Sequence, residues 1–317
     1  MLLNIILLLI GFVVLIFGAT KLVDAASSLA ARLGVPSIVI GLTIVAFGTS
    51  APELVVNVFA ATTGSTEMVL GNVLGSNIFN VLGILGISAI IYPLTVKTNT
   101  TWLEIPLSLL AAIAVFIVAA DVLLDGTAPN IITRSDALTL LLFFLIFLVY
   151  NLMVAKGNTD EEMISTENYT VGKAVLFIIL GLAGLILGGR LIVINAVNIA
   201  EVIGLSERVI GLTVVSIGTS LPELATSIIA VRKKNVDIAI GNVVGSNIFN
   251  IFLILGISGS IMPLHIAEAT FFDILINILA GFLLFIFVFT GKGRQLERWE
   301  GIVLVTLYVA YLIYLLT

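Results

Sequence analysis

The chain has 317 residues, of which 60% are hydrophobic and 10% are charged, and its mean hydropathy is +1.25. A soluble domain carries about 25% charged residues, so this composition excludes an ordinary cytosolic enzyme, a disordered protein and a nucleic-acid-binding protein. The net charge of −5 says little about partners, since the charges of a membrane protein lie in its loops. The absence of cysteine excludes disulfides and thiolate metal sites. The composition therefore predicts an integral membrane protein whose surface is covered by lipid.

Ten stretches qualify as membrane spans, since a spanning helix needs about 20 predominantly apolar residues. In chain order they cover residues 2–33, 36–62, 67–92, 103–121, 135–155, 171–203, 207–231, 236–262, 270–290 and 299–316. The first stretch lacks a basic n-region and is longer than the apolar core of a typical signal peptide, so we interpret it as a retained helix. The longest polar segment, 157–170, is only a loop and leaves no room for a soluble regulatory domain.

The distribution of Lys and Arg predicts the orientation, since cytoplasmic loops carry an excess of both. With the N-terminus outside, the inner loops and helix ends hold Arg32, Lys97, Lys156, Lys173, Arg232, Lys233, Lys234, Lys292, Arg294 and Arg298. The outer loops hold Arg134 and Arg208. This bias favours both termini outside. Lys21, Asp24 and Arg190 lie within helices, and we expect them to snorkel to an interface.

Two motifs occur twice in the chain at one constant offset of 170 residues. Residues 41–54 read GLTIVAFGTSAPEL and residues 211–224 read GLTVVSIGTSLPEL. Residues 71–80 read GNVLGSNIFN and residues 241–250 read GNVVGSNIFN. The chain is therefore a duplication of two halves.

Each half contains five spans, and an odd number makes the second half enter the membrane from the opposite side. The predicted fold class is an all-α integral membrane protein with ten transmembrane helices in two inverted five-helix repeats. Residues 1–156 form the first repeat, 157–170 a cytoplasmic linker and 171–317 the second repeat. Inverted repeats are the architecture of many secondary transporters, which alternate access to a site near the bilayer midplane.

Glu53 lies in the middle of the second span, and Glu223 has the same position in the seventh span. A buried membrane carboxylate is costly and marks an ion or proton path by default. The alternative is a protonated glutamate that is hydrogen-bonded to a neighbouring helix. Two glutamates related by the repeat and set in the same polar frame favour the ion path.

Pro52 lies inside the second span and lacks the N–H that would donate to the carbonyl of Gly48. Pro222 and Gly218 repeat this arrangement in the seventh span. Broken helix backbone at membrane depth is tolerated where it lines a cavity, and its freed carbonyls are natural cation ligands. A merely structural kink is the alternative, but the adjacent acid and hydroxyls favour a functional break.

Helical spacing places Thr49, Ser50 and Asn57 on the face of Glu53, and on the third span Asn72, Ser76 and Asn80 recur every four residues. The corresponding set in the second half is Thr219, Ser220, Ser227, Asn242, Ser246 and Asn250. Hard oxygen donors without His or Cys suit Ca²⁺ or Na⁺ and argue against zinc, copper or iron. One Ca²⁺ would neutralise two ionised glutamates, and two or three Na⁺ could compete for the same oxygens, which is sufficient for antiport.

The paired motifs G-T-S-x-P-E and G-N-V-x-G-S-N-I-F-N closely resemble the α-repeats of the sodium/calcium exchanger family, within the calcium/cation antiporter superfamily. The chain looks like a compact prokaryotic member without the large regulatory loop of animal exchangers. The resemblance implies that Glu53 and Glu223 are the central Ca²⁺ and Na⁺ ligands. It also implies coordinating roles for Thr49, Ser50, Ser76, Asn80, Thr219, Ser220, Ser246 and Asn250, and for backbone oxygens near Ala46 and Ser216. In the family, the first and sixth helices are thought to slide across the other eight to switch access.

Both copies of the second motif end in asparagine, at Asn80 and Asn250. Some family members carry Asp at the position of Asn250, and in potassium-dependent relatives an acid there is linked to potassium. Its absence weakens the case for potassium co-transport. Proton-coupled relatives have differently patterned repeats and fit less well.

We therefore expect a Na⁺/Ca²⁺ antiporter in the cell membrane that works by alternating access. Proton-coupled or potassium-dependent exchange and, less well, a passive cation channel are the alternatives. An enzyme is not expected, since no catalytic triad, cofactor loop or metal-hydrolase spacing is present. We expect no cofactor, because Ca²⁺ and Na⁺ are the transported substrates. The expected partners are these two ions and the lipid bilayer. We expect no obligate protein partner and no nucleic acid.

Overall fold

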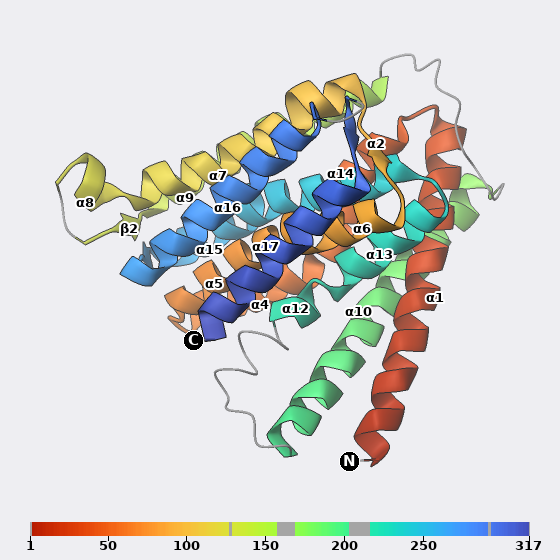
Figure 1. The fold of residues 1–317 in the computed structure, drawn as a ribbon, viewed down its shortest axis with the longest axis horizontal. Helices are drawn as coiled ribbons and strands as arrows, with labels where there is room; N and C mark the ends of the chain where they lie inside the picture. Colours follow the sequence, from red (N-terminus) through yellow and green to blue (C-terminus); the bar gives the residue numbers. More distant parts are fainter. Residues whose placement is uncertain (1, 127–128, 157–168, 203–215, 291–292, 317) are drawn as a thin grey trace.

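The computed structural model describes residues 2–126, 129–156, 169–202, 216–290 and 293–316. These residues are almost entirely helical (Figure 1). Within them, eight helices are long and apolar enough to cross a membrane, and a bent pair of helices supplies a ninth candidate span. The prediction of an all-helical membrane protein is confirmed. Most of the predicted linker, and the start of the predicted seventh span, lie outside the described residues.

The helices of the first half follow the five predicted spans to within three residues at each end. They include short π-helical segments, labelled η. In chain order the elements are α1 Leu2–Leu33, α2 Ser37–Ile40, η1 Gly41–Val45, α3 Ala46–Thr49, α4 Ala51–Thr62, α5 Thr66–Ile78, η2 Phe79–Leu85, α6 Gly86–Ile91, η3 Thr100–Glu104, α7 Ile105–Ala119, α8 Asp121–Leu124 and α9 Arg134–Lys156.

The second half repeats this order in the part that the structure describes. Its helical elements are α10 Val171–Val202, α12 Ser216–Thr219, α13 Leu221–Arg232, α14 Val236–Ile248, η5 Phe249–Leu255, α15 Gly256–Ile261, α16 Glu268–Phe287 and α17 Arg298–Leu316. Helix α14 with its continuation through η5 and α15 therefore corresponds to α5, η2 and α6. The π-helical segments η2 and η5 fall at the same place in both, and each begins at the last two residues of the second sequence motif.

Two short antiparallel strand pairs connect the halves. Strand β1, Leu94–Thr95, pairs with β4, Gln295–Leu296, and β2, Ile131–Ile132, pairs with β3, Leu264–His265. Each pair thus joins a loop of the first half to a loop of the second. Sequence analysis did not predict them, because two-residue strands leave no readable periodicity.

Helices α1 and α10 pack side by side along most of their length (Figure 1). Their backbones touch at glycines: a Cβ placed on Gly18 would lie 2.8 Å from the carbonyl oxygen of Gly181, and one on Gly188 would lie 2.8 Å from that of Gly11. Small residues allow membrane helices to approach this closely. Residue numbers rise along α1 while they fall along α10 at these contacts, so the two helices run antiparallel.

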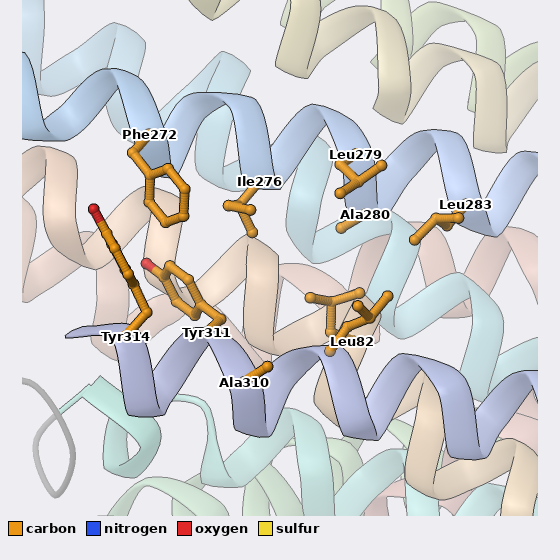
Figure 2. Close-up of a pocket in the computed structure, with 10 residues that line it drawn as sticks. Leu82, Phe272, Ile276, Leu279, Ala280, Leu283, Ala310, Tyr311 and Tyr314 are labelled. Atoms are coloured by element: carbon orange, nitrogen blue, oxygen red, sulfur yellow. The ribbon is translucent and has the colours of Figure 1, made fainter. Parts of the chain in front are cut away.

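A lateral cavity of about 220 Å³ lies between α16, α17 and η2. Figure 2 shows its lining of Leu82, Ile276, Leu279 and neighbouring apolar side chains, with Tyr311 and Tyr314 at one end. The Tyr311 hydroxyl donates to Asp273 at 2.7 Å. Because the lining is apolar, this cavity does not suit a cation.

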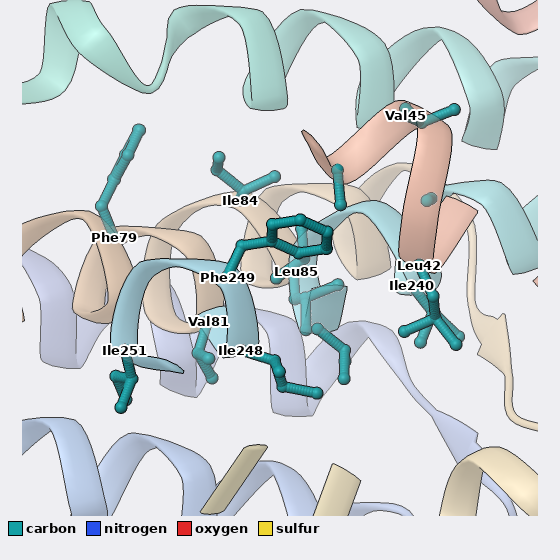
Figure 3. Close-up of a cluster of buried hydrophobic side chains, with 14 of the residues drawn as sticks. Leu42, Val45, Phe79, Val81, Ile84, Leu85, Ile240, Ile248, Phe249 and Ile251 are labelled. Carbon is teal, nitrogen blue, oxygen red and sulfur yellow. The ribbon is translucent and has the colours of Figure 1, made fainter. Parts of the chain in front are cut away.

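The helices that carry the second motif form the centre of the molecule. In the spans Thr66–Ile91 and Val236–Ile261, 78% and 94% of the most apolar stretch is buried, against 28–33% in the spans of α7, α9, α16 and α17. Side chains from η1, η2, α14 and η5 interlock there (Figure 3). Polar motif residues are thereby held away from lipid by the outer helices.

Candidate cation-binding site

The second span is broken at Ser50, where the backbone has φ −82° and ψ 4°. The helical segments on either side meet at an angle of 48°. Pro52 lies in the first turn of α4, where a missing N–H leaves no helical bond unmade. Ser220 and Pro222 repeat the arrangement before and within α13. The predicted break is confirmed, but the prolines begin new helices and do not kink continuous ones.

Glu53 and Glu223 lie in the first turns of α4 and α13, where the helix macrodipole favours a negative charge. Both side chains are buried, at 2% and 1% exposure. The hydroxyl of Ser220 donates to Glu53 Oε1 at 3.4 Å, and that of Ser50 donates to Glu223 Oε1 at 3.2 Å. Each carboxylate is therefore held by the break in the opposite half.

The serines of the second motif also reach this point. Ser246 donates to Glu223 Oε1 at 3.5 Å, and the Ser76 hydroxyl lies 3.3 Å from that of Ser220. Both Ser76 and Ser246 are buried. The structure thus brings both motifs of both halves together, as their repetition predicts.

The threonines of the first motif bind across the halves. Thr49 donates to Asn242 Oδ1 at 3.0 Å, and Thr219 lies 3.4 Å from Asn72 Oδ1. The Thr49 hydroxyl also lies 3.3 Å from the carbonyl oxygen of Ala46, which accepts the Ser50 N–H at 2.9 Å as well. In this conformation the Ala46 carbonyl is therefore already engaged.

Asn57, Ser227 and Asn242, which also belong to the predicted set, form hydrogen bonds next to the glutamates. The Asn57 amide donates to the backbone carbonyl of Glu53 at 2.7 Å. The Asn242 amide lies 3.2 Å from the Glu223 carbonyl and 3.1 Å from the Ser227 hydroxyl. The two Asn242 bonds tie α14 to α13 beside Glu223, whereas the Asn57 bond lies within α4. Ser216 begins α12, and its side chain lies outside the described part of the structure.

The side chains of Asn80 and Asn250 each bond to an asparagine of the other half. Their Nδ2 atoms donate at 2.9 Å to the side-chain oxygens of Asn247 and Asn77, respectively. The Oδ1 atoms of Asn80 and Asn250 are buried without a hydrogen-bond partner, and so are the Oε2 atoms of Glu53 and Glu223. A buried polar atom without a partner requires an explanation, and a bound ion is one. Four such oxygens, two from each half, suit a cation.

Asn77 and Asn247 join the two halves beside Asn80 and Asn250, and sequence analysis did not single them out. The Asn77 amide donates to the Asn247 carbonyl at 3.3 Å, and the Asn247 amide donates to the Asn77 carbonyl at 3.5 Å. Both side chains are buried. Their identity at the offset of 170 was available in the sequence as a signal.

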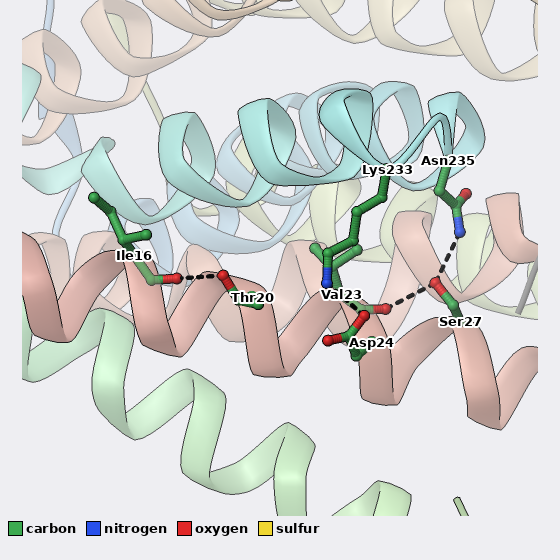
Figure 4. A network of polar contacts seen from close by, with 7 residues as sticks. All are labelled: Ile16, Thr20, Val23, Asp24, Ser27, Lys233 and Asn235. Carbon is green, nitrogen blue, oxygen red and sulfur yellow. Dashed lines mark hydrogen bonds and ion pairs between the residues drawn. The ribbon is translucent and has the colours of Figure 1, made fainter. Parts of the chain in front are cut away.

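Asp24 corrects the expectation that it snorkels to an interface. Its side chain is buried, and Lys233 Nζ lies 2.5 Å from its carboxylate. One turn further along α1, the Ser27 hydroxyl accepts a hydrogen bond from the Asn235 amide at 2.8 Å (Figure 4). These bonds connect α1 to the end of α13. Arg190 on α10 is exposed, and its reach to an interface stays a prediction.

The chain has similarity to known proteins over almost its whole length. The model of the family described as sodium/calcium exchanger protein matches residues 3–153 and 173–317. The chain belongs to this family. Family membership and the apolar helices make it a multi-pass cation antiporter of the cell membrane, and its relatives are exchangers and antiporters rather than enzymes.

Individual relatives of this exchanger-family chain support the assignment. The sodium/calcium exchanger MaX1 of Methanosarcina acetivorans is 34% identical, with 98% of each chain covered. The inner membrane protein YrbG of Escherichia coli is 40% identical over 83% of this chain and 81% of its own. Among solved structures, the sodium-calcium exchanger NCX_Mj has a TM-score of 0.83 at 31% identity, with 98% of this chain and 97% of that chain covered. The resemblance to a compact prokaryotic exchanger is therefore confirmed.

Proposed function

We propose that this chain exchanges Na⁺ for Ca²⁺ across the cell membrane by alternating access to a site built on Glu53 and Glu223. The observation that carries the proposal is the set of unpartnered oxygens on Glu53, Glu223, Asn80 and Asn250. Desolvated oxygens of this kind are stabilised by a cation that takes the place of water. The names of the exchanger relatives support Na⁺ and Ca²⁺ as the two substrates.

The proposed ligands are the hard oxygen donors that surround the two glutamates. They are Glu53, Glu223, Thr49, Ser50, Ser76, Asn80, Thr219, Ser220, Ser246 and Asn250, with backbone oxygens near Ala46 and Ser216. Ca²⁺ takes 6–8 oxygens, and two carboxylates balance its charge. Because Na⁺ would use the same oxygens, the two ions exclude each other, and this competition couples their opposite movements.

We further propose that the halves are inverted repeats with ten spans and both termini outside. The antiparallel packing of the equivalent helices α1 and α10 supports the inversion. The strand pairs support the span count, because ten spans place the loops of β1 and β4 on one side and those of β2 and β3 on the other. The orientation rests on the Lys and Arg distribution alone. The boundaries of the two repeats and of the linker 157–170 stay predictions from the sequence.

Two equivalent positions have different surroundings, which supports alternating access. Asp24 on α1 is 7% exposed against α13, whereas Ile194, its counterpart 170 residues later on α10, is 46% exposed. A transporter with two equivalent halves that alternates access packs one of them closely while the other is open. The chain would then be closed on the side of Lys233 and open on the opposite side.

Reconstituted vesicles test the proposed function. With an imposed Na⁺ gradient, wild-type protein should accumulate Ca²⁺ against its own gradient, which a passive channel cannot do. Glu53→Gln and Glu223→Gln should abolish this uptake while keeping the shape of each side chain. Glu67→Gln is the matched control, since Glu67 is exposed at the start of α5.

A second measurement separates loss of binding from loss of folding. Ca²⁺ should raise the thermal unfolding midpoint of wild-type protein and of the Glu67 variant, because it binds the native state. The Glu53 and Glu223 variants should unfold at a midpoint that Ca²⁺ does not change. Full Na⁺-driven exchange in either variant would refute the assigned site, and Ca²⁺ flux driven by a pH gradient in Na⁺-free buffer would indicate proton coupling.

A further inference from the structure

An apolar groove runs along the contact between α1 and α10. It has a volume of about 280 Å³, and its lining includes the glycines Gly18, Gly181 and Gly184. Val13, Phe17 and Leu180 line it as well and are 69%, 64% and 54% exposed, so the groove opens to the outside of the molecule. On a membrane helix pair, an open apolar groove of this kind faces lipid.

Lys21 lies in this groove although its lining is otherwise apolar. Its Nζ lies 5.7 Å from the ring centroid of Phe17 and 5.5 Å from that of Phe177. Asp24, the acid nearest along α1, is paired with Lys233. Among the described residues Lys21 forms no ion pair. A charged amine in the membrane without an acidic partner is costly, and cation–π contacts offset only part of that cost.

Lys173 lies near the same place, in the first turn of α10. Its Nζ is 5.6 Å from the Phe177 ring centroid and 4.9 Å from that of Tyr169. Because both ammonium groups lie close to the Phe177 ring, they are at most about 11 Å apart. The N-terminus of α10 adds its own partial positive charge there. One end of the apolar groove is therefore strongly electropositive.

We propose that the groove binds an anionic phospholipid, with one acyl chain along the glycines and the phosphate between Lys21 and Lys173. Basic pockets between membrane helices bind anionic headgroups in this manner. Charge complementarity selects the occupant: an anionic headgroup neutralises the ammonium groups, whereas a choline headgroup places a third positive charge beside them. Assigning the lipid to the inner leaflet rests on the orientation given under the proposed function.

Native mass spectrometry of the purified protein tests this proposal. Phosphatidylglycerol and phosphatidylcholine with the same acyl chains should be offered together. Wild-type protein should prefer phosphatidylglycerol, and Lys21→Gln/Lys173→Gln should lower that preference about tenfold or more, as expected for two lost charges near a headgroup. The matched control is Arg232→Gln/Lys234→Gln, which removes two exposed charges elsewhere and should keep the wild-type preference.

Two arms of the experiment identify what is bound. Val13→Trp fills the exposed groove wall and keeps both lysines, so it should weaken phosphatidylglycerol binding if an acyl chain lies there. Displacement of the lipid by millimolar inorganic phosphate would instead assign a free-anion site and overturn the proposal, as would an unchanged preference in the double lysine variant. None of these measurements requires ion flux, so a failure of the lipid proposal can be distinguished from a failure of the proposed exchange function.

Discussion

The Lys233 ammonium nitrogen lies 2.5 Å from a carboxylate oxygen of Asp24, which joins the end of α13 to α1. A second bond, from Asn235 to Ser27, lies beside it. The counterpart of Asp24 in the other half is Ile194, and Lys233 corresponds to Thr63, so this ion pair is not repeated at the equivalent positions. This contact between α1 and the end of α13 therefore has no ion pair as its counterpart in the other half.

Reversing either charge of this pair should open the contact between α1 and α13. The chain has no native cysteine, so Ala30→Cys, at a buried position one turn after Ser27, provides a single reactive group. We expect Asp24→Lys or Lys233→Asp to raise its rate of modification by an impermeant maleimide at least about fivefold, the population change that about 1 kcal/mol produces.

The double reversal, Asp24→Lys with Lys233→Asp, should restore slow modification, because it re-forms the pair with opposite polarity. Arg232→Asp, which changes the same charge at the neighbouring exposed residue, should have little effect. If Arg232→Asp raises the rate as much as the two reversals do, the effect is not specific to the pair.

Asn77 and Asn247 should control ion affinity without contacting the ion. Each accepts the amide of the asparagine from the other half and so orients a proposed ligand oxygen. Partners behind a metal ligand typically contribute about 10- to 100-fold to affinity, so Asn77→Ala should raise the KM for Ca²⁺ by a factor in this range. Transport kinetics over a range of Ca²⁺ concentrations measure this, with kcat changed less than KM.

The control for this prediction is Asn151→Ala on α9. Asn151 is buried as well, but its amide donates to the carbonyl of Phe147 within the same helix, at 2.9 Å. An equal rise of KM in this variant would contradict the assigned role of Asn77.

Gly18→Ala should destabilise the α1–α10 pair. The added Cβ would lie 2.8 Å from the Gly181 carbonyl oxygen and 2.8 Å from the Leu185 nitrogen, so the backbones must separate. Overpacking of this kind costs about 1–3 kcal/mol, which should lower the thermal unfolding midpoint. Gly71→Ala, where a Cβ meets nothing within 4 Å, should leave the midpoint unchanged or raise it. Equal loss in both variants would contradict the assigned close contact, because helix propensity favours Ala over Gly at both positions.

Na⁺-driven Ca²⁺ uptake should not depend on K⁺. Glu53 and Glu223 are the carboxylates of the proposed site, and both copies of the second motif end in asparagine, so the site lacks the additional acid that would balance a K⁺. Exchange assayed with K⁺ and with an impermeant organic cation in its place should have the same rate. A faster rate in K⁺ would contradict the proposed ion set.

The spans and the two glutamates could be predicted because the bilayer imposes a length on each apolar helix and makes any acid within one conspicuous. The constant offset of 170 residues also identified which residues of the two halves are equivalent. Ser50 and Glu223 could not be placed in contact from the sequence alone, since helical spacing defines the face of one helix and says nothing of the register between two.

The remaining contacts arise where single side chains meet across the halves. Asp24 lies on a helix where a charge is expected to reach water, and only the position of α13 places Lys233 beside it. Likewise, Asn77 and Asn80 belong to one motif, and periodicity alone does not tell which of them turns its oxygen to the site.

The strand pairs at the loops have a consequence for biosynthesis. Leu94 pairs with Leu296, which is translated about 200 residues later. At about 5–20 residues per second, the ribosome needs about 10–40 s to supply the missing partner. For most of that interval the first half is in the membrane without Ser220 and Asn242, which bond to its polar motif residues. The nascent chain must therefore hold Glu53 in an incomplete bundle until α13 and α14 are made.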